Sequence, residues 1–150
     1  APFSGPENPQ PWRRKGIRLY QANFDGCNEY NWYEGGHIWN DFAFQSRYKP
    51  FNMVYPTADG VIDTVAWEAL RESFDDVRYL TLLRRLARVA LRSGKRDLGR
   101  LGKAAIAWAE LIDPDAVNFA DLRANAARWI LDLQRGLAEA SVTIPPTVYE

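Results

Sequence analysis

The clearest pattern in the chain is a helical repeat of apolar residues that begins near residue 64. From Thr64 to Arg92 the apolar positions are three or four residues apart, which places them on one face of a helix. These positions are Trp67, Leu70, Phe74, Val77, Leu80, Leu83, Leu86 and Val89. Ser93 and Gly94 favour the end of this helix, because glycine is common just beyond a helix C-terminus.

The same repeat predicts two further helices in the last third of the chain. The second helix has one apolar stripe, made of Leu98, Leu101, Ala105, Trp108 and Ile112, and ends before Asp113-Pro114. The third helix is expected to begin at Asn118 as its N-cap. Its stripe contains Phe119, Leu122, Ala126, Trp129, Leu133 and Leu137. The short connections predict that these two helices form an antiparallel pair packed on the first.

The first 63 residues follow a different pattern. Prolines predict an irregular segment over residues 1–11, and an amphipathic pattern predicts a helix from Trp12 to Ala22. Residues 27–33 alternate aromatic and polar side chains, which predicts a short strand. Residues 36–64 are expected to form a long loop with a helical turn near Trp39, and loops of this length are often functional. The expected fold is mainly α with a short β portion.

Composition and charge exclude several classes of protein. The 150 residues are 47% hydrophobic and 25% charged, which is typical of a globular domain. The net charge is zero, so we expect no nucleic-acid partner, and the apolar stretches are too short to cross a membrane. The chain begins at Ala1 without a signal-peptide pattern and contains one methionine, Met53, so we expect a segment of a longer protein, of unassigned location.

Residues 53–80 carry a resemblance to a known family. The matching residues are Tyr55, Pro56, Gly60, Trp67, Glu68, Arg71, Glu72, Asp76, Tyr79 and Leu80, whereas Ser73 stands where the family has glycine. This segment resembles the C-terminal signature of the domain-of-unknown-function 4091 proteins, relatives of glycoside hydrolase family 123. Weaker likeness extends over residues 7–92, and the helical pair beyond it agrees only in kind.

The resemblance implies the closing βα part of a (β/α)8 barrel over residues 1–63, followed by a three-helix C-terminal segment over residues 64–144. It also implies a carbohydrate-directed protein. A whole barrel of this kind needs about 250 residues, and no residue of this chain matches the family's catalytic acidic pair. We therefore expect a fragment that is inactive alone, needs no cofactor, and associates with the remainder of its own protein or with another copy.

The candidate sugar-contacting residues lie in the aromatic loop: Trp32, Tyr33, Trp39 and Asp41. Sugars offer apolar C–H faces and a rim of hydroxyl groups, so a binding site combines aromatic planes with carboxylates and amides. These residue types are interleaved along residues 28–42. The alternative is that the aromatic residues fill a core, or bury against a partner chain in a non-catalytic helical interaction module.

Carboxylates on the first long helix invite a catalytic interpretation, which we consider weaker than a structural one. Glu68 and Glu72 are one helical turn apart, a spacing that any helix provides without catalytic purpose. Arginine pairs well with carboxylates, so we interpret the motif as one that holds the helix in place. The residues of this structural motif are Trp67, Arg71, Asp75, Asp76, Arg78 and Tyr79.

Three other features are weaker candidates. His37 is the only histidine and Cys27 the only cysteine, so neither predicts a metal site, and Cys27 is expected to be a buried, inert thiol. The run from Arg84 to Lys103 is strongly basic and could bind nucleic acid or an anionic membrane surface. The regular core stripe beneath it and the acidic residues that follow it favour a solvated face.

Overall fold

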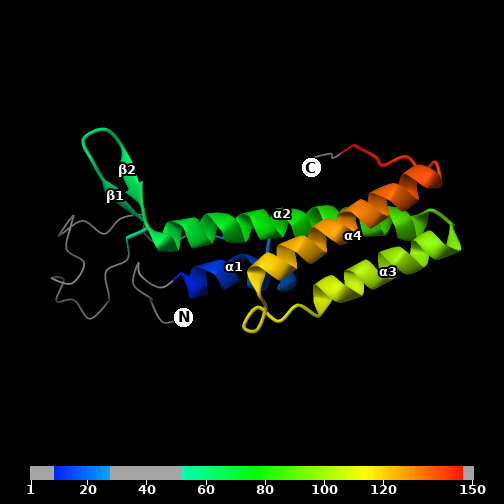
Figure 1. Ribbon diagram of the computed structural model, residues 1–150, viewed down its shortest axis with the longest axis horizontal. Helices are drawn as coiled ribbons and strands as arrows, with labels where there is room; N and C mark the ends of the chain where they lie inside the picture. Colours follow the sequence, from blue (N-terminus) through cyan, green and yellow to red (C-terminus); the bar gives the residue numbers. More distant parts are fainter. Residues whose placement is uncertain (1–8, 28–51, 147–150) are drawn as a thin grey trace. The chain divides into compact units, whose positions relative to one another are not determined.

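The computed structural model describes residues 9–27 and 52–146 of the chain. Within these ranges the secondary structure is four helices and one two-stranded antiparallel sheet, in the order α1, β1, β2, α2, α3 and α4 (Figure 1). The prediction of a mainly α fold with a short β portion is therefore confirmed. The long loop predicted up to residue 64 is wrong in its last part, because residues 54–63 pair as a hairpin, and most of the strand predicted over residues 27–33 lies outside the described residues. The chain forms two compact units, Ala1–Asp75 and Asp76–Glu150, with the division inside α2.

The first unit contains α1 (Gln10–Gln21), the β-hairpin and the beginning of α2 (Val65–Arg92). Strand β1 (Val54–Pro56) pairs with β2 (Val61–Asp63), so that Tyr55 lies opposite Ile62. A small apolar core joins α1, β1 and α2, and Trp67 packs against it. Its buried members are Trp12, Met53, Val54, Ala66, Ala69 and Leu70.

The second unit contains the rest of α2, together with α3 (Arg96–Glu110) and α4 (Phe119–Glu139). A Cβ placed on Gly102 of α3 would lie 2.6 Å from the carbonyl oxygen of Ala87, so α2 and α3 pack very closely there. A Cβ on Gly136, near the end of α4, would lie 3.0 Å from Leu98, near the start of α3. These contacts confirm the predicted antiparallel pair and its packing on the first long helix (Figure 1).

Local chemistry explains where these helices begin and end. The predicted cap of α4 is confirmed, because the side-chain oxygen of Asn118 accepts hydrogen bonds from the backbone N–H groups of Ala120 and Asp121. Helix α2 ends at Arg92, and Gly94 beyond it has a φ of +71°, which glycine adopts without steric cost.

One predicted core position is wrong. Phe74 is 40% exposed, whereas Ser73 beside it and Asp76 two residues further on are fully buried. The buried line of α2 passes through Ala66, Leu70, Ser73, Asp76 and Leu80. The apolar pattern missed this line because Ser73 and Asp76 are polar, and their side chains are buried with hydrogen-bond or ion-pair partners.

Candidate functional site

The hairpin and α2 are joined through one hydroxyl group. Thr64 lies between β2 and α2 and is buried. Its Oγ1 donates a hydrogen bond to the carbonyl oxygen of Met53 at 2.7 Å and accepts one from the backbone N–H of Trp67 at 3.1 Å. Thr64 therefore caps α2 and also ties the start of the hairpin to it. A threonine directly before Val65, the first residue of the helix, is a capping signal that the sequence analysis missed.

Four carboxylates near the start of α2, at positions 68, 72, 75 and 76, all lie against arginine side chains. Within α2, Glu68 Oε2 is 2.7 Å from Nη2 of Arg71, and Asp75 Oδ2 is 3.4 Å from Nη1 of the same residue. The pKa of the Arg71 guanidinium is raised, mainly by its hydrogen bonds to Glu68 and next by the negative charge of Glu68. Arg71 therefore stays charged, and these exposed pairs support the helix only weakly.

The remaining two carboxylates pair with arginines from other elements. Glu72 Oε2 is 3.1 Å from Nε of Arg13, a buried residue of α1. Asp76 is fully buried, and its Oδ1 is 3.0 Å from Nε and 2.9 Å from Nη2 of Arg123 on α4. This arrangement supports the structural interpretation of the motif, because each carboxylate is held by a cation instead of facing an open cleft.

The other residues of the motif have different surroundings. Ser73 is fully buried and its Oγ donates a hydrogen bond to the carbonyl oxygen of Leu70 at 2.7 Å. This contact satisfies the hydroxyl at the position where the resembled family has glycine. Tyr79 is 37% exposed and Arg78 is exposed, so both lie on the outer side of α2.

The predicted sugar-contacting residues Trp32, Tyr33, Trp39 and Asp41 lie outside the described residues, as does His37. The role of each therefore stays a prediction. Cys27 lies within the described residues and is exposed, so the expectation of a buried thiol is wrong. Its position just after the bend at Asp25 leaves it outside the packed core of the first unit.

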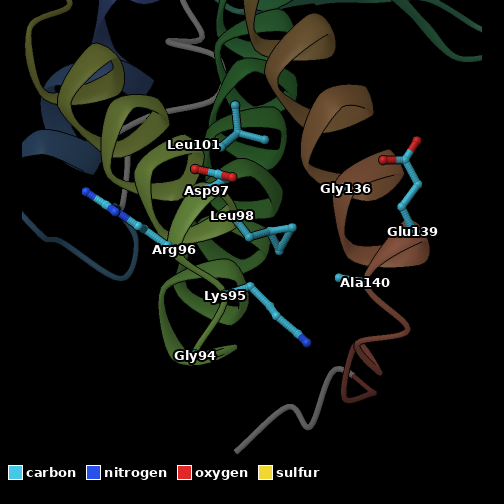
Figure 2. Close-up of a pocket in the computed structure, with 9 residues that line it drawn as sticks. All are labelled: Gly94, Lys95, Arg96, Asp97, Leu98, Leu101, Gly136, Glu139 and Ala140. Carbon is cyan, nitrogen blue, oxygen red and sulfur yellow. The ribbon is translucent and has the colours of Figure 1, made fainter.

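A groove that the sequence analysis did not foresee lies in the second unit. It has a volume of about 720 Å³ and is bordered by the first residues of α3 and the last residues of α4. Leu98 and Leu101 provide apolar surface, and Lys95, Arg96, Asp97 and Glu139 provide charge. Figure 2 shows the side chain of Leu98 between the two helices, with Lys95 extending toward the end of the groove near Ala140. No local sequence signal predicts it, because its two sides are about forty residues apart.

No grouped set of metal ligands and no candidate membrane span lies within residues 9–27 and 52–146. Within these ranges, no three or more histidine, cysteine, aspartate or glutamate residues lie together as a metal site would require. No helix of this part of the chain has the length and apolar character of a membrane span.

Comparisons with protein-family models, with curated proteins and with solved structures found no match to this chain.

Proposed function

We propose that this chain is the C-terminal part of a glycoside-hydrolase-like protein, in which it contributes carbohydrate-contacting residues without the catalytic acid pair. The observation that carries the proposal is the way in which residues 53–80 fold. The residues on which the family resemblance rests form one continuous hairpin and helix, joined by Thr64. Because barrel strands are parallel and this hairpin is antiparallel, we propose that it follows the closing strand of the (β/α)8 barrel and leads into the C-terminal helices.

The carboxylates of α2 support a structural role for this unit and not a catalytic one. Glu68, Glu72 and Asp76 each lie within 3.1 Å of an arginine nitrogen. Each of these carboxylates is already engaged by an arginine, as suits a group that holds the helix in place. In this proposal the sugar contacts come from the aromatic loop, through Trp32, Tyr33, Trp39 and Asp41, whose residue types suit a sugar.

A glycan array tests this function directly. The array carries neutral, N-acetylated and acidic oligosaccharides, and a parallel assay measures hydrolysis of aryl glycosides. We expect the chain to bind at least one class of glycan and to hydrolyse none of the aryl glycosides. An array without binding by either the chain or the full-length protein would refute the carbohydrate proposal.

A second candidate function, contact with a partner chain, is favoured by the surface of the hairpin. Val61 is 57% exposed and Ile62 is 50% exposed on β2, and Val65 at the start of α2 is 59% exposed. Val61 and Ile62 lie on opposite faces of the hairpin, so each face exposes an apolar side chain that another protein surface can cover. The remainder of the same protein and a second copy of the chain are the two partners that we propose for it.

A further inference from the structure

The charge of the chain is unevenly distributed along the sequence. Residues 84–103 contain eight arginine and lysine residues and one aspartate, a net charge of +7 in a chain whose total is zero. Six of these cations are exposed and form what we call the basic band: Arg88, Arg92, Lys95, Arg96, Arg100 and Lys103. A positive field of this kind attracts anionic partners.

Helical spacing arranges the basic band in two rows that meet at one end of the second unit. Arg88 and Arg92 are four residues apart on α2, and Arg96 and Arg100 are four residues apart on α3. Residues four apart lie on the same side of a helix, about 6 Å from each other along its axis. The two rows meet at the connection between α2 and α3, residues 93–95, and Lys95 in this connection also belongs to the basic band.

The basic band is not neutralised by the described part of the chain. Arg88, Arg92, Lys95, Arg96 and Lys103 form no ion pair with any residue in the described ranges. Arg100 lies 3.7 Å from Asp97, but the two side chains are 67% and 94% exposed, so water weakens their attraction. The acidic residues that follow the band along the chain therefore do not neutralise it, and its cations can bind a ligand.

The groove beside the band gives it a shape that suits a sugar ring. Lys95 and Arg96 belong to both features. Figure 2 shows Leu98 and Lys95 on the side of α3 that faces α4, whereas the side chain of Arg96 extends to the other side, at the edge of the groove. A sugar ring places C–H groups against an apolar surface and hydroxyl groups against polar side chains. Glu139 borders the groove and can accept hydrogen bonds from such hydroxyls.

Two other classes of anionic partner fit the region less well. Residues 84–103 contain no aromatic residue, and proteins that bind single-stranded nucleic acid stack bases on aromatic side chains. Peripheral helices insert a broad apolar face into a membrane, whereas the core stripes of α2 and α3 are buried through Leu83, Leu86, Leu98 and Ala105. Leu82 and Leu91 of α2 are exposed, but two single leucines do not make such a face.

We infer that the basic band and its groove bind an acidic polysaccharide through the carboxylate or sulfate groups of that ligand. The guanidinium group forms paired hydrogen bonds with such anions, and four of the six residues of the band are arginine. The inference rests on the proposed function only in its choice of a carbohydrate as the carrier of the negative charge.

Binding titrations with four probes test the inference. The probes are polygalacturonate oligomers, heparin oligosaccharides, neutral dextran oligomers and a single-stranded RNA. Wild-type chain is compared with R92Q/R96Q and with the matched control R128Q/R135Q, which removes the same charge from exposed positions on α4. Each exposed ion contact contributes a few-fold to affinity, so we expect about tenfold weaker binding of the acidic saccharides by R92Q/R96Q and about twofold or less by the control.

Three results would overturn the inference: equal losses in the two variants, tighter binding of RNA than of both acidic saccharides, or no binding of either acidic saccharide. Circular dichroism and thermal melts of the variants confirm that each is folded. Binding of a neutral glycan that is abolished by W32A, together with equal losses of acidic-saccharide binding in the two charge variants, would preserve the proposed function while the inference about the basic band fails. The two proposals can therefore fail separately.

Discussion

The fully buried carboxylate of Asp76 on α2 is paired with the guanidinium of Arg123 on α4, 47 residues later in the chain. Nε and Nη2 of Arg123 lie 3.0 Å and 2.9 Å from the same carboxylate oxygen. The pair connects two helices of the second unit in a way that apolar packing alone would not specify. Without Arg123, the buried carboxylate of Asp76 would be an unpaired negative charge inside the protein, which is strongly destabilising.

Replacing Arg123 tests how strongly the second unit depends on this pair. R123A is expected to lower the free energy of unfolding by about 3 kcal/mol, at the low end for a buried pair, because Arg123 is itself 35% exposed. R135A is the control, since Arg135 is 3.9 Å from Asp132 and both are exposed, and it should cost about 0.5 kcal/mol or less. Urea unfolding of both variants gives the comparison, and equal losses would contradict the role of the pair.

The capping hydroxyl of Thr64 leads to a second prediction. T64V keeps the shape of the side chain and removes the hydrogen bonds to Met53 and Trp67. We expect a loss of about 1 kcal/mol in unfolding free energy, the typical cost of a lost N-cap. T64S retains the hydroxyl and should recover most of that loss in the same urea titration. A T64S variant as unstable as T64V would show that the hydroxyl is not responsible.

Two glycines of α3 provide a matched pair for the close packing of α2 and α3. In G102A the new methyl group would lie 2.6 Å from the carbonyl oxygen of Ala87, so we expect a loss of about 1–3 kcal/mol from overpacking. A Cβ placed on Gly99 would meet no atom within 4 Å, so G99A should stabilise the helix by up to about 1 kcal/mol. Thermal melts that show the same sign for both variants would contradict the packing described.

The exposed hairpin predicts association of the isolated chain. Val61 and Ile62 are at least half exposed on a strand whose outer edge can pair with another strand. V61K/I62K should reduce the increase of sedimentation coefficient with concentration, whereas L111K should not, although Leu111 is 83% exposed. A wild-type chain that sediments as a monomer at high concentration would contradict the prediction.

The periodic pattern predicts the helices well but not all of the contacts between them. The expected helix from Thr64 to Arg92 agrees with α2, because its core stripe is long and regular. The predicted stripe is wrong at Phe74, because Ser73 and Asp76 are buried there instead. Ser73 forms a hydrogen bond with the carbonyl oxygen of Leu70, and Asp76 pairs with Arg123, so both polar side chains have a partner inside the protein. No periodic signal connects Asp76 with Arg123, because their pairing depends on how α2 and α4 pack.

For the candidate sites too, the sequence predicts features within one helix but not features formed between helices. The resemblance and the helical spacing singled out Arg71, Asp75 and Asp76, and the structure places all three in ion pairs. The groove between α3 and α4 could not be predicted, because it lies between the start of one helix and the end of another, about forty residues apart in the chain. Sequence patterns report which face of a helix is buried, whereas a groove depends on the space left between two faces.

Saccharide titration of Trp32 and Trp39 variants of the full-length protein tests the central claim most directly. Each variant is measured by glycan binding and by thermal melting, with W67A as the control, because Trp67 packs against the core of the first unit. We expect W32A and W39A to weaken binding of an array-selected glycan by about 1–3 kcal/mol with little change in melting temperature, on the scale of aromatic stacking. W67A should instead lower the melting temperature through loss of core packing, at a cost of up to about 3–5 kcal/mol, and leave the glycan affinity of the folded protein unchanged. A large fall in melting temperature with unchanged glycan affinity for both W32A and W39A would contradict the account.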